Sequence, residues 1–302
     1  MTEGRLLITD VGPRDGLQSQ PSMVPTEGKR ELIRALFAAG LRRIEATSFV
    51  SPQAVPQMAD AGELMKDLDA PDDARVSVLV PNMRGLERAA AAGAQEIAVV
   101  LSATETMNRK NIRMGLHEAL DTCMATLGAA VRQGLRTRAY VAVAFACPFE
   151  GRTPPGIVAD LAQEMKSAGA SEIVVADTIG AAAPADVLQV LEALGRRGLP
   201  VDAIGMHLHD TRGMALANAW CAIAEGVRRF DTSIGGLGGC PFAPGAAGNL
   251  ATEDLVLMAH QCGLDTNIEL DRLLQAVDIA GRLVGYPVGG RSHKWQSRQK
   301  VG

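Results

Sequence analysis

Two histidines separated by one residue are the strongest chemical signal in this sequence. They are His207 and His209, in the segment His207–Asp210. In a β-strand alternate side chains point to the same face, so both imidazoles would project together while Met206 and Leu208 point the other way. A pair of imidazoles on one face is typical of a metal site. Two histidines held by hydrogen bonds in a polar interior would give the same pattern.

A glycine-rich segment with one cysteine is the second signal. Residues 235–248 hold six glycines in fourteen positions and include Cys240. Either a tight cap or a mobile lid that carries Cys240 over a site would use so many glycines. The spacing does not match the GxGxxG pattern of dinucleotide-binding loops. Cys147 is a second candidate thiol, whereas the three remaining cysteines fall in helical stretches and are predicted to be packing residues.

The segments that must position these residues alternate between strands and helices. Eight short runs rich in Val and Ile are bounded by Gly, Pro or Asp and predict strands. They are Leu6–Val11, Arg43–Phe49, Val76–Val80, Glu96–Ser102, Thr137–Phe145, Glu172–Asp177, Ala203–His209 and Arg229–Ile234. Helical patterns lie between most of them, for example at Thr26–Ala39, Pro184–Leu194 and Met214–Gly226. This alternation predicts parallel strands in an α/β fold, a (β/α)₈ TIM barrel with an extra C-terminal helix.

The whole chain, residues 1–302, is predicted to form one catalytic domain. The barrel would occupy about residues 6–262, and a C-terminal helical extension about residues 263–287. The basic and polar residues 288–302 are predicted to form a tail with frayed last residues.

The barrel prediction completes the metal site, because catalytic residues of this fold lie at the C-terminal ends of the strands. Asp15 follows the first strand, which neighbours the last strand when the barrel closes, and Asn249 follows the glycine-rich loop. With the two histidines they offer two nitrogens and two oxygens, a set that suits Mg²⁺ or Mn²⁺. Arg14 would be either a surface ion-pair partner or a cation that stabilises an oxyanion. Glu45 has the parity of an inward-facing residue and therefore needs a partner.

Composition and charge exclude several classes of protein. The chain has 30 basic and 34 acidic residues, a net charge of −4, and only 3% aromatic residues, so nucleic acid is not expected as a partner. The longest apolar stretch is about half the roughly 20 residues of a membrane-spanning helix, so no membrane association is expected. Five cysteines without CxxC pairs argue against a disulfide framework and indicate the cytoplasm.

Six motifs together resemble the hydroxymethylglutaryl-CoA lyase family, which belongs to a superfamily of metal-dependent lyases and synthases on TIM barrels. The resemblance covers about residues 6–285. The motifs are Asp10–Gln18, Glu45–Pro52, Asn108–Ile112, Ala176–Gly180, His207–Asp210, and Gly236–Pro241 continuing through Gly248–Asp254. The segment Gly12–Gln18 and the Gly-Gly-Cys-Pro loop are specific to the lyase branch of this superfamily.

The resemblance implies an activity and a role for each site residue. The expected reaction is cleavage of 3-hydroxy-3-methylglutaryl-CoA to acetyl-CoA and acetoacetate by a retro-Claisen step, as in leucine degradation. The implied metal ligands are Asp15, His207, His209 and Asn249. The implied catalytic residues are Arg14 for the enolate, Cys240 as acid, His207 as base, and Glu45 and Asp177 as orienting groups. Arg14 and Gln18 would contact the acyl-CoA substrate, and a homodimer is expected.

Departures from the family pattern leave the acyl group open. Ser19, Gln20 and Pro21 stand where the family usually has Asn-Glu-Lys, so one expected cation is missing. Arg212 stands where tyrosine or asparagine is usual. A lyase, aldolase or synthase acting on a related hydroxyacyl-CoA or 2-hydroxy diacid is one alternative. A metal-binding barrel that has lost its chemistry is another, which the presence of Arg14 and Cys240 argues against.

Overall fold

Eight parallel strands close into a barrel in the computed structural model, which describes residues 4–239 and 248–299. Around the barrel the strands run in the order β1-β10-β9-β8-β5-β4-β3-β2, and every neighbouring pair is parallel. The strands are β1 (Leu7–Asp10), β2 (Arg43–Ser48), β3 (Arg75–Leu79), β4 (Glu96–Ser102), β5 (Arg136–Ala142), β8 (Glu172–Asp177), β9 (Ile204–Leu208) and β10 (Arg229–Thr232). This confirms the predicted barrel and each predicted strand within a few residues.

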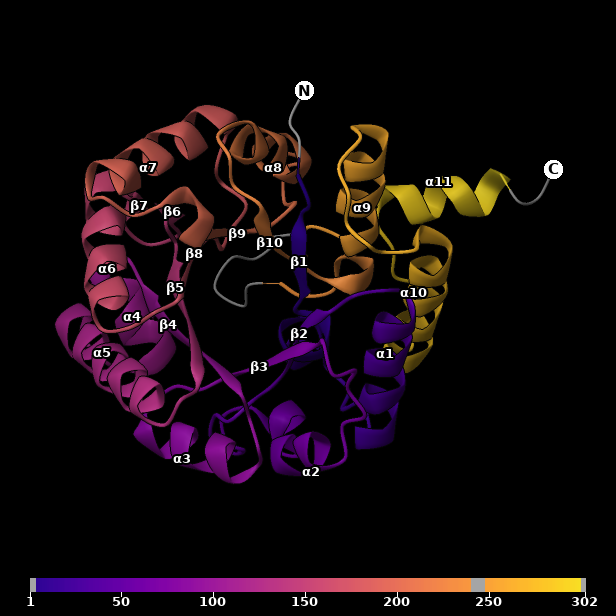
Figure 1. Ribbon diagram of the computed structural model, residues 1–302, viewed down its shortest axis with the longest axis horizontal. Coiled ribbons are helices and arrows are strands. Elements are labelled where there is room, and N and C mark those ends of the chain that lie inside the picture. Colours follow the sequence, from indigo (N-terminus) through magenta and orange to yellow (C-terminus); the bar gives the residue numbers. More distant parts are fainter. Residues whose placement is uncertain (1–3, 240–247, 300–302) are drawn as a thin grey trace.

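Helices surround the barrel and cover its outer face (Figure 1). They are α1 (Thr26–Ala38), α2 (Ala61–Lys66), α3 (Met83–Ala91), α4 (Glu105–Ile112), α5 (Leu116–Arg132), α6 (Pro155–Ser167), α7 (Pro184–Arg196), α8 (Ala215–Ala224), α9 (Thr252–Gln261), α10 (Leu270–Val284) and α11 (Arg291–Gln299). Short single turns are η1 (Gly12–Gly16), η2 (Pro56–Met58), η3 (Val201–Ala203) and η4 (Ile234–Gly236), and β6 (Ala146–Cys147) pairs with β7 (Gly151–Arg152) in a small hairpin. The described part of the chain contains no helix long and apolar enough to cross a membrane.

The two faces of the barrel strands differ in chemistry. Residues such as Ile44, Met206 and Leu208 point outward and are buried against the helices. The inward face is largely polar and includes the buried side chains of Glu45 and Arg138. A polar interior without bulk water requires paired charges, so the barrel core is held by ion pairs as well as by packing.

The prediction of a frayed C-terminal end is wrong for residues 291–299, which form helix α11. The helix projects from the ring beside α9 and α10 (Figure 1). Its start is capped from a distance: the Asp254 carboxylate accepts hydrogen bonds from the backbone N–H groups of Arg291 and Ser292, at 2.9 and 2.7 Å. The composition of this segment is polar, but a buried acidic cap stabilises the first turn of the helix.

Candidate metal centre and active site

The two histidines of β9 point together into the C-terminal mouth of the barrel, as predicted. Their Nε2 atoms lie 3.2 Å apart, and both rings are almost fully buried. The other nitrogen of His207, Nδ1, lies 3.7 Å from a carboxylate oxygen of Asp231 on β10. A carboxylate behind one ring nitrogen favours a proton on Nδ1 and leaves Nε2 as the electron-pair donor, an arrangement that is common for metal-bound histidine.

Asp15 and Asn249 complete the cluster from two other elements. Ligand atoms of Asp15, His207 and His209 all lie within 4.8 Å of one another. Asn249 is brought beside His209 by an isolated antiparallel bridge between the two residues, and its Nδ2 donates to Asp15 Oδ2 at 2.8 Å. That bond directs Oδ1 of Asn249 away from Asp15, and this buried oxygen has no hydrogen-bond partner within residues 4–239 and 248–299.

The donor set fits a divalent cation on chemical grounds. The two Nε2 atoms lie close enough to share either a proton or a cation, and the buried amide oxygen, which has no partner within the described residues, is costly unless it binds one. A cation between them would satisfy both groups together with the Asp15 carboxylate. Two nitrogens, a carboxylate and an amide oxygen suit Mg²⁺ or Mn²⁺ better than a closed structural zinc site.

Arg14 lies next to this cluster and is held between two carboxylates. Its guanidinium donates to Glu45 Oε1 and, through Nη1, to Asp15 Oδ1 at 2.7 Å. Burial opposes the charge on Arg14, but the Glu45 and Asp15 carboxylates outweigh it and raise the pKa of Arg14. Burial also acts against ionised Asp15, while Arg14 and His207 lower the pKa of Asp15 overall. Both groups are therefore charged and fixed in place.

The turn that presents Arg14 and Asp15 is η1, a single π-helical turn directly after β1. Asp10 Oδ1 accepts from the backbone N–H of Gly12 at 2.8 Å, and Thr252 Oγ1 donates to Asp10 Oδ2 at 2.6 Å. Burial raises the pKa of Asp10 to about 6, although these hydrogen bonds lower it. One of the departures from the family pattern also braces this turn, because Gln20 Nε2 donates to the Gly16 carbonyl at 2.8 Å.

A buried ionic network under the site was not predicted from the sequence. Arg138 of β5 donates to Glu172 Oε1 and Asp231 Oδ1 at 2.7 and 2.6 Å, and to the hydroxyl of Tyr140 at 3.0 Å. The Tyr140 hydroxyl donates to Asp231, and it lies 3.4 Å from Glu45 Oε2. Burial raises the pKa of Asp231, but Arg138 and His207 lower it overall. The network thus joins the His207 side of the site to the Arg14 side.

A sequence signal for this network existed in the parity of the strands. Arg138 and Tyr140 alternate with apolar residues in β5, as His207 and His209 do in β9. Parity identifies inward-facing residues, but the partners Glu172 and Asp231 are 34 and 93 residues away from Arg138. Only closure of the barrel pairs them.

Asp177 and Gln18, both predicted as site residues, lie at the same end of the barrel. The Asp177 carboxylate accepts from the backbone N–H groups of Ala181 and Ala182, at 2.8 and 3.1 Å, so it holds the loop after β8. Burial raises the pKa of Asp177. Gln18 is partly exposed beside η1. Arg212, the second departure from the family pattern, donates to the carbonyl groups of Gly180 and Ala182 and holds the same loop as Asp177.

The predicted acid Cys240 lies outside the described residues, but the chain that leads to it reaches the metal cluster. Gly238 has a φ of +116°, and a Cβ there would meet Asn249 Nδ2 at 2.4 Å and Asp15 Oδ2 at 3.3 Å. Only glycine fits this backbone conformation and this contact. The other candidate thiol, Cys147, is buried in the β6–β7 hairpin and accepts a hydrogen bond from Thr104 Oγ1 at 3.1 Å.

A strained residue marks the same end of the barrel. Val143, directly after β5, has a φ of +49°, which is unfavourable for a β-branched residue. Two loop side chains hold it: its N–H donates to Thr178 Oγ1 at 2.8 Å, and its carbonyl accepts from Thr153 Oγ1 at 2.7 Å. Strain of this kind is often found where a fold positions functional loops.

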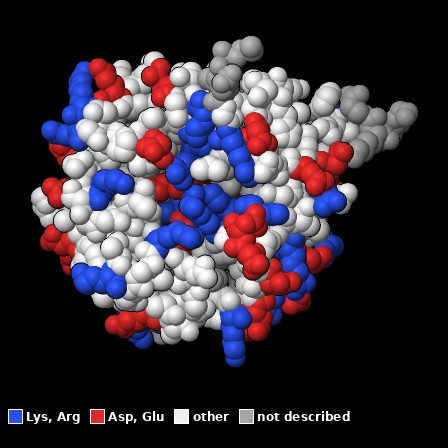
Figure 2. All heavy atoms as spheres, in the orientation of Figure 1, with Lys and Arg blue, Asp and Glu red and all other residues white. Residues whose placement is uncertain are grey.

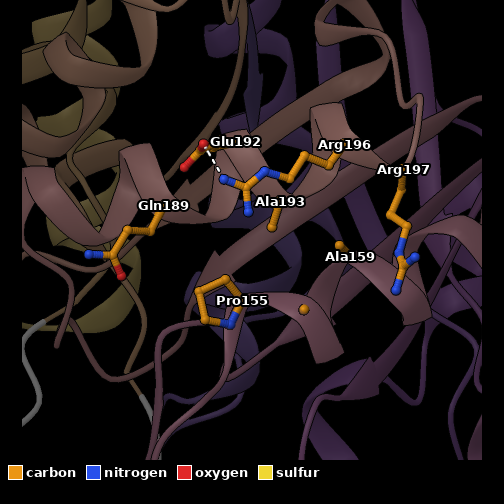
Figure 3. Close-up of a pocket in the computed structure, with 8 residues that line it drawn as sticks. Pro155, Ala159, Gln189, Glu192, Ala193, Arg196 and Arg197 are labelled. Carbon is orange, nitrogen blue, oxygen red and sulfur yellow. Dashed lines mark hydrogen bonds and ion pairs between the residues drawn. The ribbon is translucent and has the colours of Figure 1, made fainter.

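A surface pocket of about 500 Å³ between α6 and α7 contains none of these residues (Figure 3). It is lined by Pro155, Gly156, Ala159, Gln189, Glu192, Ala193, Arg196 and Arg197. Two of its charged residues, Glu192 and Arg196, pair with each other. The predicted site residues lie at the barrel mouth and do not line this pocket.

Comparisons with known proteins agree with the family resemblance. The HMGL-like family model matches residues 5–279. The chain is 44% identical over 288 residues to hydroxymethylglutaryl-CoA lyase of Bacillus subtilis, covering 95% of this chain and 96% of that protein. It is 43% identical over 285 residues to the mitochondrial hydroxymethylglutaryl-CoA lyase of Arabidopsis thaliana, covering 94% of this chain and 61% of that relative.

Solved structures give the same result. The crystal structure of the Bacillus subtilis HMG-CoA lyase superposes with a TM-score of 0.94 at 44% identity, covering 97% of this chain and 98% of that one. An HMG-CoA lyase from Acinetobacter baumannii in complex with coenzyme A and 3-methylmalate superposes with a TM-score of 0.91 at 38% identity, covering 96% of this chain and 94% of that one.

Proposed function

The chain belongs to the HMGL-like family, and from this premise we propose that it cleaves 3-hydroxy-3-methylglutaryl-CoA to acetyl-CoA and acetoacetate with the help of a divalent cation. The observation that carries the proposal is the convergence of Asp15, His207 and His209 with the buried, unpartnered oxygen of Asn249. Arg14, a fixed cation, lies directly beside them.

The reaction needs no oxidant, reductant or second substrate. The tertiary hydroxyl loses its proton, and the bond between the carbinol carbon and the CH₂ of the thioester breaks. The carbinol carbon becomes the ketone of acetoacetate, and the electron pair of the broken bond moves into the thioester enolate. That enolate takes up one proton and becomes acetyl-CoA.

The metal would be held by Asp15, His207, His209 and Asn249, and we propose Mg²⁺ or Mn²⁺. When bound, the cation would polarise the substrate hydroxyl and lower its pKa. The protein contributes the orientation of these ligands. The Asp231 carboxylate lies 3.7 Å from Nδ1 of His207, and the bridge to His209 fixes Asn249.

Arg14 would stabilise the enolate. The guanidinium is charged and buried, and Glu45 and Asp15 hold it without bulk water, so its position changes little as negative charge develops on the thioester oxygen. Glu45 therefore acts as a positioning residue for Arg14. Asp177 would orient the neighbouring loop, and Gln18 is proposed as a substrate contact.

Two groups are proposed for the proton transfers. His207 is proposed to accept the hydroxyl proton, which Nε2 can do only while it is released from the cation, because the other ring nitrogen, Nδ1, faces Asp231. Cys240 would protonate the enolate, since a thiol pKa near 8.5 suits transfer at neutral pH. The position of Gly238 against Asp15 and Asn249 supports this role for Cys240. Cys240 follows two residues later, and two residues extend the chain by only about 7 Å.

The substrate class, the pathway, the oligomeric state and the cellular location are proposed from the same family membership. The substrate is proposed to be an acyl-CoA, as the coenzyme A in the Acinetobacter complex supports, and the pathway to be leucine catabolism. A homodimer and a cytoplasmic location are also proposed; the free Cys123 and Cys147 support the latter.

An acetyl-CoA release assay tests the proposal. The purified protein should form acetyl-CoA and acetoacetate from hydroxymethylglutaryl-CoA, lose this activity with excess EDTA, and recover it with Mg²⁺ or Mn²⁺. Condensation of acetyl-CoA with a 2-oxo acid, or full activity in excess chelator, would contradict it.

Two histidine variants separate metal binding from proton transfer. His209→Ala should weaken metal affinity, and high metal concentration should restore much of its turnover. His207→Ala should stay slow at any metal concentration, because it lacks both a ligand and the proposed base. If high metal concentration restored the turnover of both variants equally, His207 would not be the base.

A further inference from the structure

The opposite end of the barrel, where the strands begin, carries a group of arginines that the proposed reaction does not use. Figure 2 shows Lys and Arg side chains gathered at the centre of one face, over the barrel axis. Five arginines occupy inward-facing or mouth positions at or near the starts of strands. They are Arg43 on β2, Arg75 on β3, Arg136 and Arg138 on β5, and Arg229 on β10.

The register of the strands places these side chains on the inner face. Arg75 is the register partner of Arg43, and Arg136 is the register partner of the buried Glu96. Register partners on neighbouring parallel strands point to the same face. Arg43 points inward, since its guanidinium reaches Glu172 on β8 at 2.6 Å. Arg75 and Arg136 therefore start from the inner side of the mouth.

The carboxylates at this end do not balance the arginines. Three acidic side chains, Glu96, Glu172 and Asp231, face the five arginines in this part of the barrel. Glu172 alone takes hydrogen bonds from three of the arginines, and Asp231 takes one from Arg138. Two positive charges are left over at the mouth, although the whole chain has a net charge of −4.

The surplus charge belongs to Arg75 and Arg136. Both side chains are exposed, and neither has an ion pair or hydrogen bond to any side chain within the described ranges. Arg75 also lies opposite Arg43, and like charges on register partners of neighbouring strands destabilise each other. An anion bound between Arg75 and Arg136 would offset the repulsion between Arg75 and Arg43.

We propose that this mouth is a second ligand site, which binds a phosphate-type oxyanion between Arg75 and Arg136. One strand separates β3 from β5, and the register places Arg136 level with Ser77, two residues further along than Arg75, so the backbones of Arg75 and Arg136 lie roughly 12 Å apart, within reach of two long side chains around one tetrahedral anion. Guanidinium groups bind phosphate oxygens in pairs and keep their charge at all physiological pH values. The site lies about 20 Å along β5 from the end that carries the metal cluster, so it is separate from the acyl-CoA site.

Calorimetric titration with inorganic phosphate tests the proposal. The protein is first saturated with coenzyme A and Mg²⁺, so that phosphate-binding groups at the catalytic end are occupied. The double variant Arg75→Gln/Arg136→Gln should bind phosphate at least tenfold more weakly than the unmodified protein. The matched control Arg84→Gln/Arg132→Gln, which removes two exposed arginines from α3 and α5, should bind it within twofold of the unmodified protein.

Several outcomes would overturn the proposal. Phosphate binding that survives in Arg75→Gln/Arg136→Gln, an equal loss in the control variant, or no phosphate binding to the unmodified protein would each do so. The single variant Arg136→Gln serves if the double variant fails to fold, and it should still weaken binding severalfold. Adenosine monophosphate and adenosine, titrated in parallel, distinguish a nucleotide phosphate from free phosphate. Binding of adenosine alone would contradict a phosphate site.

Discussion

Arg14 is both a structural part of this site and its proposed electrostatic catalyst. It touches the carboxylate of Asp15, a proposed metal ligand, on one side and the buried Glu45 on the other. Both contacts use its guanidinium as a rigid fork, a geometry that lysine cannot reproduce. The charge is therefore in place before the substrate arrives, which is the condition for effective electrostatic stabilisation of a transition state.

Substitution of Arg14 should reveal this role in the turnover number. Arg14→Gln is expected to lower kcat by 10²–10³-fold or more, roughly the effect of losing one oxyanion donor, with little change in KM. Glu45→Gln should produce a smaller decrease in the same direction, since it loosens Arg14 without removing it. Steady-state kinetics check both variants, and a large rise in KM at unchanged kcat would instead make Arg14 a substrate anchor.

Cys240 and Cys147 offer a matched pair of thiol substitutions. Cys240→Ala should lose most turnover yet still bind metal, whereas Cys147→Ala should keep most of its activity, because Cys147 is buried and serves as an acceptor for Thr104. Alkylation should inactivate the unmodified enzyme, and substrate should protect it. Peptide mapping identifies the modified thiol, and a label that tracks lost activity at Cys147 would refute the role of Cys240.

Among the elements, the C-terminal segment is unexpectedly tied to the start of the glycine-rich loop. Gly289 N–H donates to the Gly235 carbonyl at 3.1 Å, and Val288 fills the space beside Gly235, which has a φ of +63°. Glu253 links the same two segments, because its carboxylate accepts from Gly235 N–H at 3.1 Å and from Gly290 N–H at 2.7 Å. The chain around residues 288–292 therefore braces η4.

Glu253 should give this contact a measurable pH dependence. Burial raises its pKa from 4.5 to about 7, although hydrogen bonds from Gly290 and Gly235 lower it. A carboxyl group with a raised pKa stabilises the fold fully below the unfolded pKa, near 4.5, and this stability is lost as the pH rises through about 7. The free energy of unfolding should therefore be lower at pH 8 than at pH 5, with up to about 3 kcal/mol of the difference due to Glu253.

Urea unfolding of Glu253→Gln at both pH values measures this contribution. The amide does not ionise, so the stability of the variant should differ less between pH 5 and pH 8 than that of the unmodified protein. Asp10, whose pKa is also raised, to about 6, contributes in the same direction and is present in both proteins. Glu118→Gln, at an exposed position on α5, is the control and should keep the full difference. A variant Glu253→Gln with an unchanged pH difference would show that Glu253 is ionised throughout this range.

At the scale of the whole molecule, the protein has two cores: ion-paired charged residues inside the barrel, and an apolar layer between the barrel and the surrounding helices. Helices pack on the outward-facing aliphatic residues of the strands, while Arg138, Glu172 and Asp231 fill the interior. The network supports the site from below, because Asp231 also faces His207. Charges out of water are costly when one partner is removed, so the network constrains the barrel as a unit.

Substitution of Arg138 should therefore cost far more stability than loss of a surface pair. Arg138→Met leaves the buried Asp231 carboxylate without its arginine and removes one of the three arginines that contact Glu172, and we expect it to lower the free energy of unfolding by about 3–5 kcal/mol. Arg196→Met removes an exposed pair with Glu192 on α7 and should cost less than about 1 kcal/mol. Urea denaturation compares the two variants, and similar small losses would show that the interior network adds little to stability.

The sequence by itself determined the barrel, the strands and which residues converge as candidate metal ligands, because the signals involved are local. Alternation along β9 predicted that His207 and His209 share a face, and the position of Asp15 after β1 predicted that it joins them. The assignment of Arg14 to the enolate and of Cys240 as the acid came from resemblance to a family, and Cys240 lies outside the described residues.

Only the tertiary structure decided which polar residues meet inside the barrel and what happens to the chain end. Parity along a strand says that Arg138 points inward, but its pairing with Asp231, 93 residues away, depends on how β5 and β10 face each other across the closed barrel. Likewise α11 is polar enough to suggest a tail, yet Asp254 from another helix caps its first turn. Interactions between neighbours in sequence leave a periodic pattern, whereas interactions across the fold exist only once the barrel has closed.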